Sequence, residues 1–134
     1  KLRGAVANCS PGALSREDHY LHLMDQCESL LEKRWLTWLK NRGLRLPNFA
    51  QHYLPDYMTR PDFMYEIGGV RYAIYVDGPV HTQGQQAEND RRIDDRLENG
   101  GIMVLRFREG DDWDVIAAEY ESLFGGIVDG GITA

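Results

Sequence analysis

The chain has 134 residues, of which 43% are hydrophobic and 27% are charged, and its formal net charge is −6. This length and composition fit one globular domain and exclude a wholly disordered chain. The negative charge argues against a protein that coats nucleic acid without specificity, and no apolar run approaches the roughly 18 residues of a membrane span.

The two cysteines, Cys9 and Cys27, have neither CxxC spacing nor a nearby histidine pair at zinc spacing. This excludes a disulfide scaffold and argues against a structural zinc site, and a reducing, cytoplasmic compartment is expected. The chain begins with Lys1 and shows no signal peptide. It is therefore compatible with a piece of a longer protein whose other domains are partners.

Small residues, glycine and proline punctuate residues 1–15, which predicts a flexible segment or linker. An amphipathic helical pattern follows over residues 16–42, and Gly43 ends it. The pattern leaves open whether this stretch forms one helix or two. Residues 32–45 are rich in bases, which suits either a phosphate-contacting face or an ordinary solvated helix: Lys33, Arg34, Lys40, Arg42 and Arg45.

The alternating rhythm of β-strands begins after this helical region. Residues 49–54 are a short candidate strand, and residues 62–67 alternate clearly, with Phe63, Tyr65 and Ile67 on one face. Gly68-Gly69 is typical of a two-residue hairpin turn, and residues 70–77 alternate again. The sequence therefore predicts an antiparallel hairpin.

The last third of the chain predicts a polar helix over residues 85–99, a short buried strand over 102–107 and a final helix capped by Asp111 or Asp112. Residues 126–134 are rich in glycine, and we expect a loose tail. Residues 16–125 then form one α/β domain, with a mixed central sheet of about four strands flanked by helices.

Two aspartates stand at the outer ends of the predicted hairpin strands. If Ile67 pairs with Val70, Asp77 lies two positions beyond the partner of Asp62, on the same face, because side chains alternate with a period of two. Two carboxylates at one end of a sheet suit Mg²⁺, which prefers oxygen ligands and keeps several waters. Ordinary turn chemistry beside proline or glycine is the alternative explanation.

Further sequence pieces accompany these acids in a fixed order. They are Glu32 in "EKRWLTWL", Gln51 in "FAQHY", Asp62 in "PDF", Asp77 in "YVDG" with His81 soon after, Asp90 before "RRIDDRL", and "GIMVLRF". In this order the chain resembles the very-short-patch-repair-like branch of the PD-(D/E)XK nucleases, from about Cys27 to Phe124. The resemblance implies a restriction-endonuclease-like three-layer fold and a metal-dependent endonuclease domain that hydrolyses DNA phosphodiester bonds. Such domains often end longer DNA-repair, helicase or defence proteins.

The resemblance also implies a metal centre. Asp62 and Asp77 would hold Mg²⁺ or Mn²⁺, together with the main-chain carbonyl of Val76. Such an ion polarises a phosphodiester and helps to deprotonate a water.

Three more residues receive roles from the resemblance. Glu32 would orient water or hold a second ion, and Gln51 would position the scissile strand. His81 would act as a general base or stabilise the phosphate, which suits a side chain that titrates near neutral pH. From the residues alone, Glu28 competes with Glu32 as the helix acid, and His81 is equally compatible with an ordinary loop histidine.

The chain departs from the family pattern at three positions. Tyr75 replaces a glutamate common in relatives, Pro79 replaces the usual lysine, and Ile93 replaces an arginine. The first two departures, Tyr75 and Pro79, favour a second hypothesis, a catalytically inactive nuclease-fold module for DNA binding or protein docking. A third is a protein-interaction domain that uses the acidic last helix.

DNA contacts are predicted at three arginines. Arg91 and Arg92 would line a DNA groove, although the acids interleaved with them also fit a solvated helix. Arg106 would reach a phosphate, and a surface salt bridge is the alternative. The His19 and His22 pair has helical spacing but lacks a third metal ligand nearby.

Overall fold

The computed structural model describes residues 15–78 and 84–125. The elements in chain order are α1 (Arg16–Gln26), α2 (Leu30–Arg42), β2 (Phe49–Ala50), β3 (Phe63–Ile67), β4 (Val70–Asp77), α3 (Gly84–Asn99), β5 (Ile102–Arg108), α4 (Trp113–Glu119) and α5 (Glu121–Phe124). The expected tail and all of the expected linker except Ser15 lie outside the described residues, as do Pro79 and His81.

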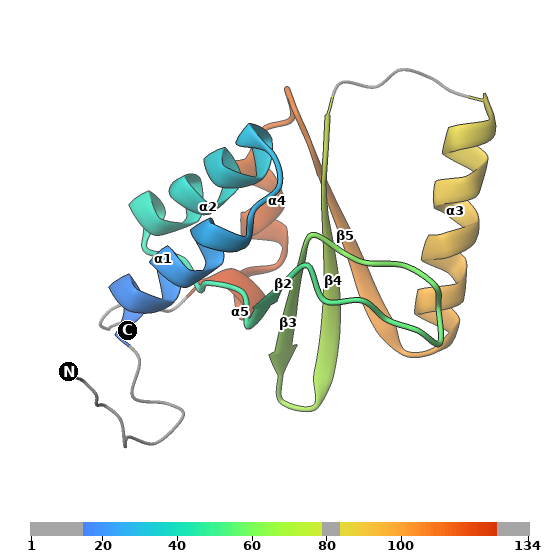
Figure 1. Ribbon diagram of the computed structural model, residues 1–134, viewed down its shortest axis with the longest axis horizontal. Coiled ribbons are helices and arrows are strands. Elements are labelled where there is room, and N and C mark those ends of the chain that lie inside the picture. Colours follow the sequence, from blue (N-terminus) through green and yellow to red (C-terminus); the bar gives the residue numbers. More distant parts are fainter. Residues whose placement is uncertain (1–14, 79–83, 126–134) are drawn as a thin grey trace.

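The four strands form one open, mixed sheet in the order β2-β3-β4-β5. The first two pairings are antiparallel, whereas β4 and β5 run parallel and are connected through α3. Helices α1, α2, α4 and α5 lie on one side of this sheet and α3 lies on the other (Figure 1). The prediction of an α/β domain with a mixed four-stranded sheet is confirmed.

The hairpin between β3 and β4 has the predicted register. Ile67 is the partner of Val70, so Phe63 faces Ile74 at the far end of the pair. Gly68 and Gly69 adopt φ angles of 56° and 83°, the left-handed conformation that a tight two-residue turn requires. The turn therefore fixes which residues meet at the open end of the hairpin.

The helical region between residues 16 and 42 consists of two helices. Ser15 caps α1 by accepting the Asp18 N–H, and Ser29 caps α2 by accepting the Glu32 N–H. At the end of α2, Gly43 has a φ of 70° and donates its N–H back to the helix. The second serine cap explains the break, because it starts a new helix just after the first one ends.

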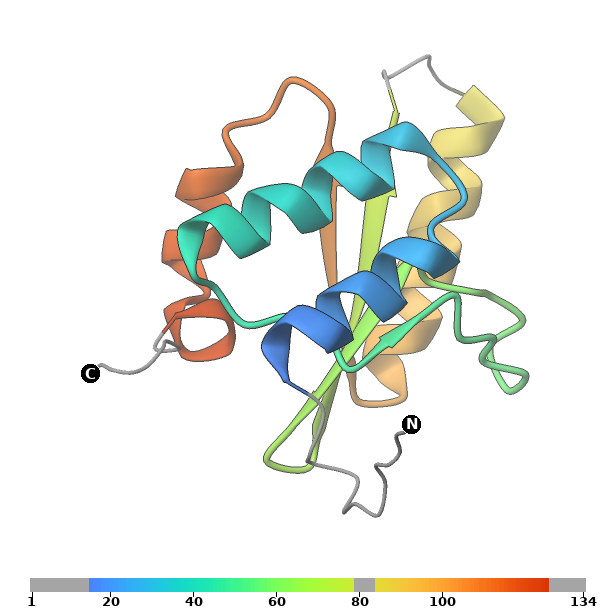
Figure 2. The same cartoon turned by 60° about the vertical axis from the view of Figure 1, so that its left-hand side comes forward.

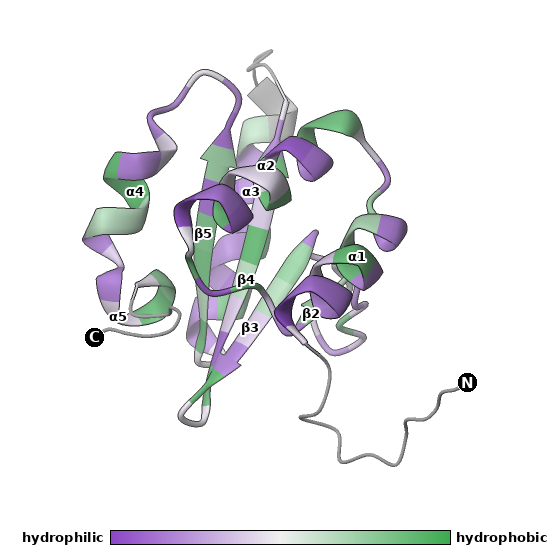
Figure 3. Ribbon diagram, turned by 90° about the vertical axis from the view of Figure 1, so that its left-hand side faces the viewer, coloured by the Kyte–Doolittle hydropathy of each residue, from purple (hydrophilic) through white to green (hydrophobic). Residues whose placement is uncertain are grey.

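The sheet face below α1, α2, α4 and α5, named here the apolar face, carries the larger core. Trp35 of α2 is fully buried, and its ring lies 4.9 Å from the Phe63 ring and 5.3 Å from the Phe107 ring. Phe107 also contacts Phe124 at 5.9 Å. Figure 3 shows hydrophobic stretches along β4 and β5, with hydrophilic residues on the outward sides of α1 and α2.

The opposite sheet face, named here the charged face, is covered by α3. Its apolar cluster is small and contains Leu54, Met64, Ala73, Leu97 and Ile102. Polar side chains of β4 and β5 occupy the rest of the contact with α3. This is the face on which the predicted acid Asp77 lies.

Two expected elements differ from the structure. The strand expected over 49–54 stops at Ala50, because Gln51 has a φ of 55° and leaves the extended conformation. The single final helix is divided at Tyr120 into α4 and α5. Within residues 15–78 and 84–125, no helix is both long and apolar enough to cross a membrane.

Candidate functional site

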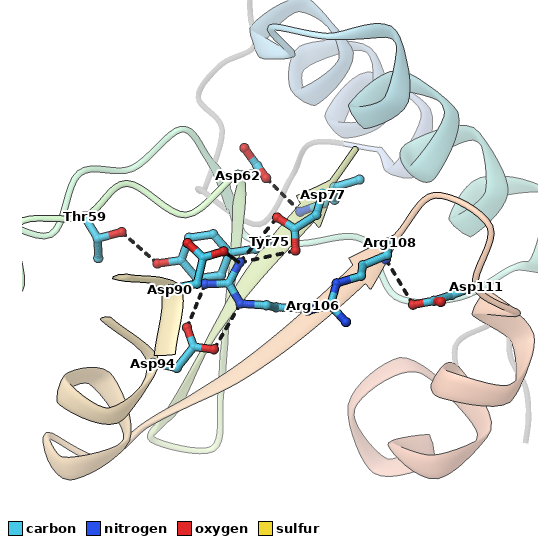
Figure 4. A network of polar contacts seen from close by, with 10 residues as sticks. Thr59, Asp62, Tyr75, Asp77, Asp90, Asp94, Arg106, Arg108 and Asp111 are labelled. Carbon is cyan, nitrogen blue, oxygen red and sulfur yellow. Dashed lines mark hydrogen bonds and ion pairs between the residues drawn. The ribbon is translucent and has the colours of Figure 1, made fainter. Parts of the chain in front are cut away.

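The two predicted acids lie at the same end of the β3–β4 hairpin. Asp77 is the last residue of β4, and Asp62 directly precedes β3. Extending the observed register by one step places Asp62 opposite Tyr75, two positions before Asp77 on the same face. Figure 4 shows both aspartates at this end of the sheet.

The Asp62 carboxylate replaces a missing ladder contact. Its Oδ2 accepts the Val76 N–H at 2.7 Å. The register places Pro61 opposite Val76, and because proline has no N–H, the ladder offers no donor to the Val76 carbonyl. Because the N–H and carbonyl of one strand residue point to the same side, the Val76 carbonyl also points toward Asp62. This end of the hairpin thus presents carboxylate and carbonyl oxygens together.

Glu32 and Gln51 approach this end from α2 and from the loop after β2. Gln51 donates its side-chain Nε2–H to Glu32 Oε1 at 2.9 Å, and its main-chain N–H to the Asp62 carbonyl at 3.0 Å. Glu32 Oε1 also accepts the Glu28 N–H at 2.9 Å. Glu32 is 7% exposed and acts on the pKa of Asp62, whereas Glu28 is exposed and pairs with Arg60, so Glu32 is the helix acid of this site.

The backbone at Gln51 is strained. Its φ of 55° places a residue other than glycine in the left-handed region, which costs of order 1–3 kcal/mol. The two hydrogen bonds to Glu32 and Asp62 maintain this conformation. Strain of this kind concentrates at functional sites, so it supports Gln51 as part of one.

Burial and mutual repulsion change the acidity of the two aspartates. Burial raises the pKa of Asp62 to about 7, against the opposing Val76 hydrogen bond, and the charges of Glu32 and Asp77 add to the increase. Burial also raises the pKa of Asp77, although the neighbouring Arg106 guanidinium lowers it. Burial therefore outweighs the opposing hydrogen bonds and ion pair at both carboxyl groups.

Arg106 of β5 lies inside the charged face rather than on the surface. Its side chain is 14% exposed and forms ion pairs with Asp77 at 3.2 Å and Asp94 at 2.8 Å. Its guanidinium carbon lies 4.3 Å from the centre of the Tyr75 ring. Figure 4 shows this network, in which Arg106 connects α3 to the end of β4. Of the two predictions for Arg106, the salt bridge is observed, but in the interior.

The other predicted DNA contacts lie on the surface. Arg91 and Arg92 are exposed on α3, and Arg92 forms a long ion pair of 4.0 Å with Glu88. Sequence reasoning did not identify Arg108, which is the strand partner of Asp77 and is exposed. Its charge lowers the pKa of Asp77, so it lies close enough to act on the same site.

The remaining candidates have ordinary structural roles. His19 Nε2 lies 2.7 Å from the Pro47 carbonyl, which anchors α1 to the loop before β2. Burial raises the pKa of the Cys27 thiol to about 12, so it remains protonated near neutral pH. Among residues 15–78 and 84–125, no three histidine, cysteine or acidic side chains gather closely enough to hold a metal ion.

Asp94 and Asp90 were missed as site residues. They stand four apart on α3 and so share one face of the helix, the spacing that was available from the sequence. The arginines between them suggested a solvated helix. Because acids and bases alternate along this helix, the sequence did not indicate that Asp94 points toward the sheet. Figure 2 shows α3 lying along the sheet, and Asp94 of this helix reaches Arg106 of β5 at 2.8 Å.

Comparisons of the chain with family models, with curated proteins and with solved structures find no match.

Proposed function

We propose that this chain is a metal-dependent endonuclease domain of the PD-(D/E)XK kind, with a restriction-endonuclease-like fold, acting on DNA. The observation that supports this most is the meeting of Asp62 and Asp77 at one hairpin end, beside the buried pair of Glu32 and Gln51. These are the four positions, among the described residues, to which the family resemblance assigns catalytic roles. The domain would act within a longer DNA-repair, helicase or defence protein.

The available donors fit a hard divalent ion such as Mg²⁺ or Mn²⁺. Asp62, Asp77 and the Val76 carbonyl supply only oxygen, and magnesium commonly uses one or two carboxylates while keeping several waters. The raised pKa values of both aspartates indicate a place where added positive charge is favourable. A cage of three acids is absent from the described part of the chain, so most ligands of the ion would be water.

The side chains divide the work of hydrolysis between them. A bound divalent ion supplies Lewis acidity toward the phosphodiester and lowers the pKa of a water. Glu32, fixed by the Gln51 amide, orients that water by accepting its hydrogen bond. His81 lies outside the described residues, and its proposed role as a general base stays with the resemblance.

DNA would approach over the exposed cations near the carboxyl ends of β4 and β5. Arg108 lies beside Asp77, and Arg91 and Arg92 are exposed on α3. Phosphate contacts of this kind position a nucleic acid without selecting a sequence. Because the chain as a whole has a net charge of −6, phosphates are expected to approach it at these local cations.

The catalytically inactive module is the second candidate, and one observation favours it. Arg106 already neutralises Asp77, as a structural ion pair would. Tyr75 stands where relatives carry an acid, and it contributes a ring face instead. Such a module would be retained on DNA at low salt without cleaving it.

A plasmid-nicking assay with Mg²⁺ or Mn²⁺ tests the nuclease proposal. Wild type is expected to nick supercoiled plasmid, while Asp62→Asn and Asp77→Asn each lose at least about 100-fold in rate, as for an electrostatic group of the reaction. Asp114→Asn is the matched control, because Asp114 pairs with Arg42 on the outside of the apolar face. It should cleave like the wild type.

Two results would contradict the nuclease. Cleavage that survives both site changes indicates a contaminant or another site. Retention on DNA at low salt without any cleavage, together with no Mn²⁺ binding at millimolar concentration, favours the inactive module.

A further inference from the structure

Arg106 makes unequal use of its two carboxylate neighbours. Its Nε and Nη2 form a two-point contact with Asp94, at 3.0 and 2.8 Å. Only Nη1 remains, and it contacts both oxygens of Asp77 at 3.3 and 3.2 Å, with Asp90 at 4.0 Å. The position of the guanidinium is therefore set by Asp94, and Asp77 receives its remaining N–H groups.

The aromatic side of the network fixes the same guanidinium from another direction. Its carbon lies 4.3 Å from the centre of the Tyr75 ring, a cation–π distance. The Tyr75 hydroxyl is in turn 2.8 Å from the Thr59 hydroxyl. Arg106 is thus anchored by groups other than Asp77.

A fixed cation beside a carboxylate opposes a second cation at that carboxylate. A divalent ion on Asp77 would meet the positive charge of Arg106 across one carboxyl group, where screening by water is reduced because the arginine is largely buried. Asp90 and Asp94 offset part of that charge from the α3 side. The balance of these charges determines how tightly an ion is held.

We propose that Arg106 is a positioning residue that sets the divalent-ion affinity of Asp77, with its guanidinium acting as a built-in competitor anchored by Asp94. This rests on the proposed metal site. It assigns to Arg106 a role that the salt bridge alone does not require: the arginine weakens ion binding instead of supporting it.

Mn²⁺ titration of the DNA-free protein, followed by the electron paramagnetic resonance of the free ion, measures this affinity without any cleavage. Arg106→Gln is expected to bind Mn²⁺ about tenfold more tightly than wild type, because a neighbouring positive charge is removed. Adding Asp77→Asn to that variant should abolish the gain. Arg42→Gln is the matched control, since Arg42 also contacts an aspartate, Asp114, through two nitrogens, and it should leave the affinity unchanged.

A second variant tests the same idea with the arginine retained. Asp94→Asn removes the charge that anchors the guanidinium, which then pairs more fully with Asp77, so the Mn²⁺ affinity should fall several-fold. Circular dichroism at each step verifies that the variants are folded. Loosened packing would weaken ion binding in both variants, so opposite changes in the two cannot come from damage to the fold.

The outcomes separate this inference from the nuclease proposal. If wild type binds Mn²⁺ through Asp62 and Asp77 but Arg106→Gln binds equally or more weakly, the competitor role is wrong and the metal site stands. If only Arg106→Gln binds, the competitor role stands and the wild-type nuclease does not. If neither binds at millimolar Mn²⁺, both proposals are wrong.

Discussion

The two faces of the sheet use different physics to attach their helices. The apolar face joins α1, α2, α4 and α5 through interlocking rings, in which Trp35, Phe63 and Phe107 are fully buried. The charged face joins α3 through a small apolar cluster and one arginine shared among three aspartates. The first arrangement depends on area removed from water, and the second on the pairing of charges.

This difference separates stability from function in one small domain. Buried rings contribute the same free energy at any ordinary pH, so they can carry the fold without affecting the site. Partly buried acids are costly to ionise, and such groups cluster where ions or substrates bind. Asp62 lies where the two faces meet, because Glu32 from the apolar side and Asp77 from the charged side both act on it.

The largest expected effect is on the apolar face. Phe107→Ala removes a ring that contacts Trp35, Trp38, Trp113 and Phe124. Loss of a buried phenylalanine should lower the free energy of unfolding by about 3–5 kcal/mol. Urea denaturation followed by tryptophan fluorescence measures this loss, which should be equal at pH 5 and pH 8.

The matched control lies on the same strand. Met103 is 44% exposed, so Met103→Ala should cost less than about 1 kcal/mol. If the loss of unfolding free energy in Phe107→Ala changes strongly with pH, the apolar face is coupled to the charged face. The two faces would then not separate stability from function.

The fold was largely predictable because its patterns are local. Alternation in residues 62–67 and 70–77, with Gly68-Gly69 between them, predicted the hairpin and its register. The strand expected over 49–54 begins as predicted but ends at Ala50, because two hydrogen bonds from Gln51 to distant residues keep its backbone out of the extended conformation. Such tertiary contacts override a local alternation without leaving a pattern in it.

Only the part of the candidate site that lies on the β3–β4 hairpin was predictable from the sequence. Asp62 and Asp77 could be located by counting from the turn. The partners of Arg106 could not, because Asp94 reaches it only through the packing of α3 on β5, across a parallel connection. A helix with alternating acids and bases predicts a solvated surface unless its tertiary neighbour is known.

The next largest effect concerns Asp62 in metal-free solution with EDTA. Its pKa is raised from 3.8 to about 7, so its contribution to stability is fully present below pH 3.8 and is lost as the pH rises through 7. That shift sets an upper limit of about 4 kcal/mol, and the wild type bears this cost at pH 8. Asp62→Asn stays neutral and should be about 1–3 kcal/mol more stable than wild type at pH 8, with little difference at pH 4.

Urea denaturation at a series of pH values measures the difference. Asp95→Asn, an exposed aspartate on α3, removes the same charge without burial and should leave the pH profile close to that of the wild type. An Asp62→Asn protein that is less stable than wild type at pH 8 would mean that the charged hydrogen bond from Val76 outweighs burial. The raised pKa of Asp62 would then be refuted.

The smallest expected effect is the loss of the N-cap of α2, a helix that contributes both to the apolar face and to the candidate site. Ser29 caps α2 by accepting the Glu32 N–H at 3.1 Å, and α2 carries both Trp35 into the apolar face and Glu32 to the site. Ser29→Ala should cost about 1 kcal/mol, and Ser15→Ala, which removes the equivalent cap of α1, should cost a similar amount.

The two cap variants should differ in Mn²⁺ affinity although their stabilities match. Without its cap, the first turn of α2 frays and Glu32 loses its fixed position beside Asp62, so Ser29→Ala should bind Mn²⁺ more weakly. Ser29→Asp keeps an acceptor and should restore the affinity. Helix α1 contributes to the apolar core but supplies no group to the site, so Ser15→Ala should leave Mn²⁺ binding unchanged. Equal losses of affinity in both alanine variants would mean that the site responds only to global stability, and the division between the faces would be wrong.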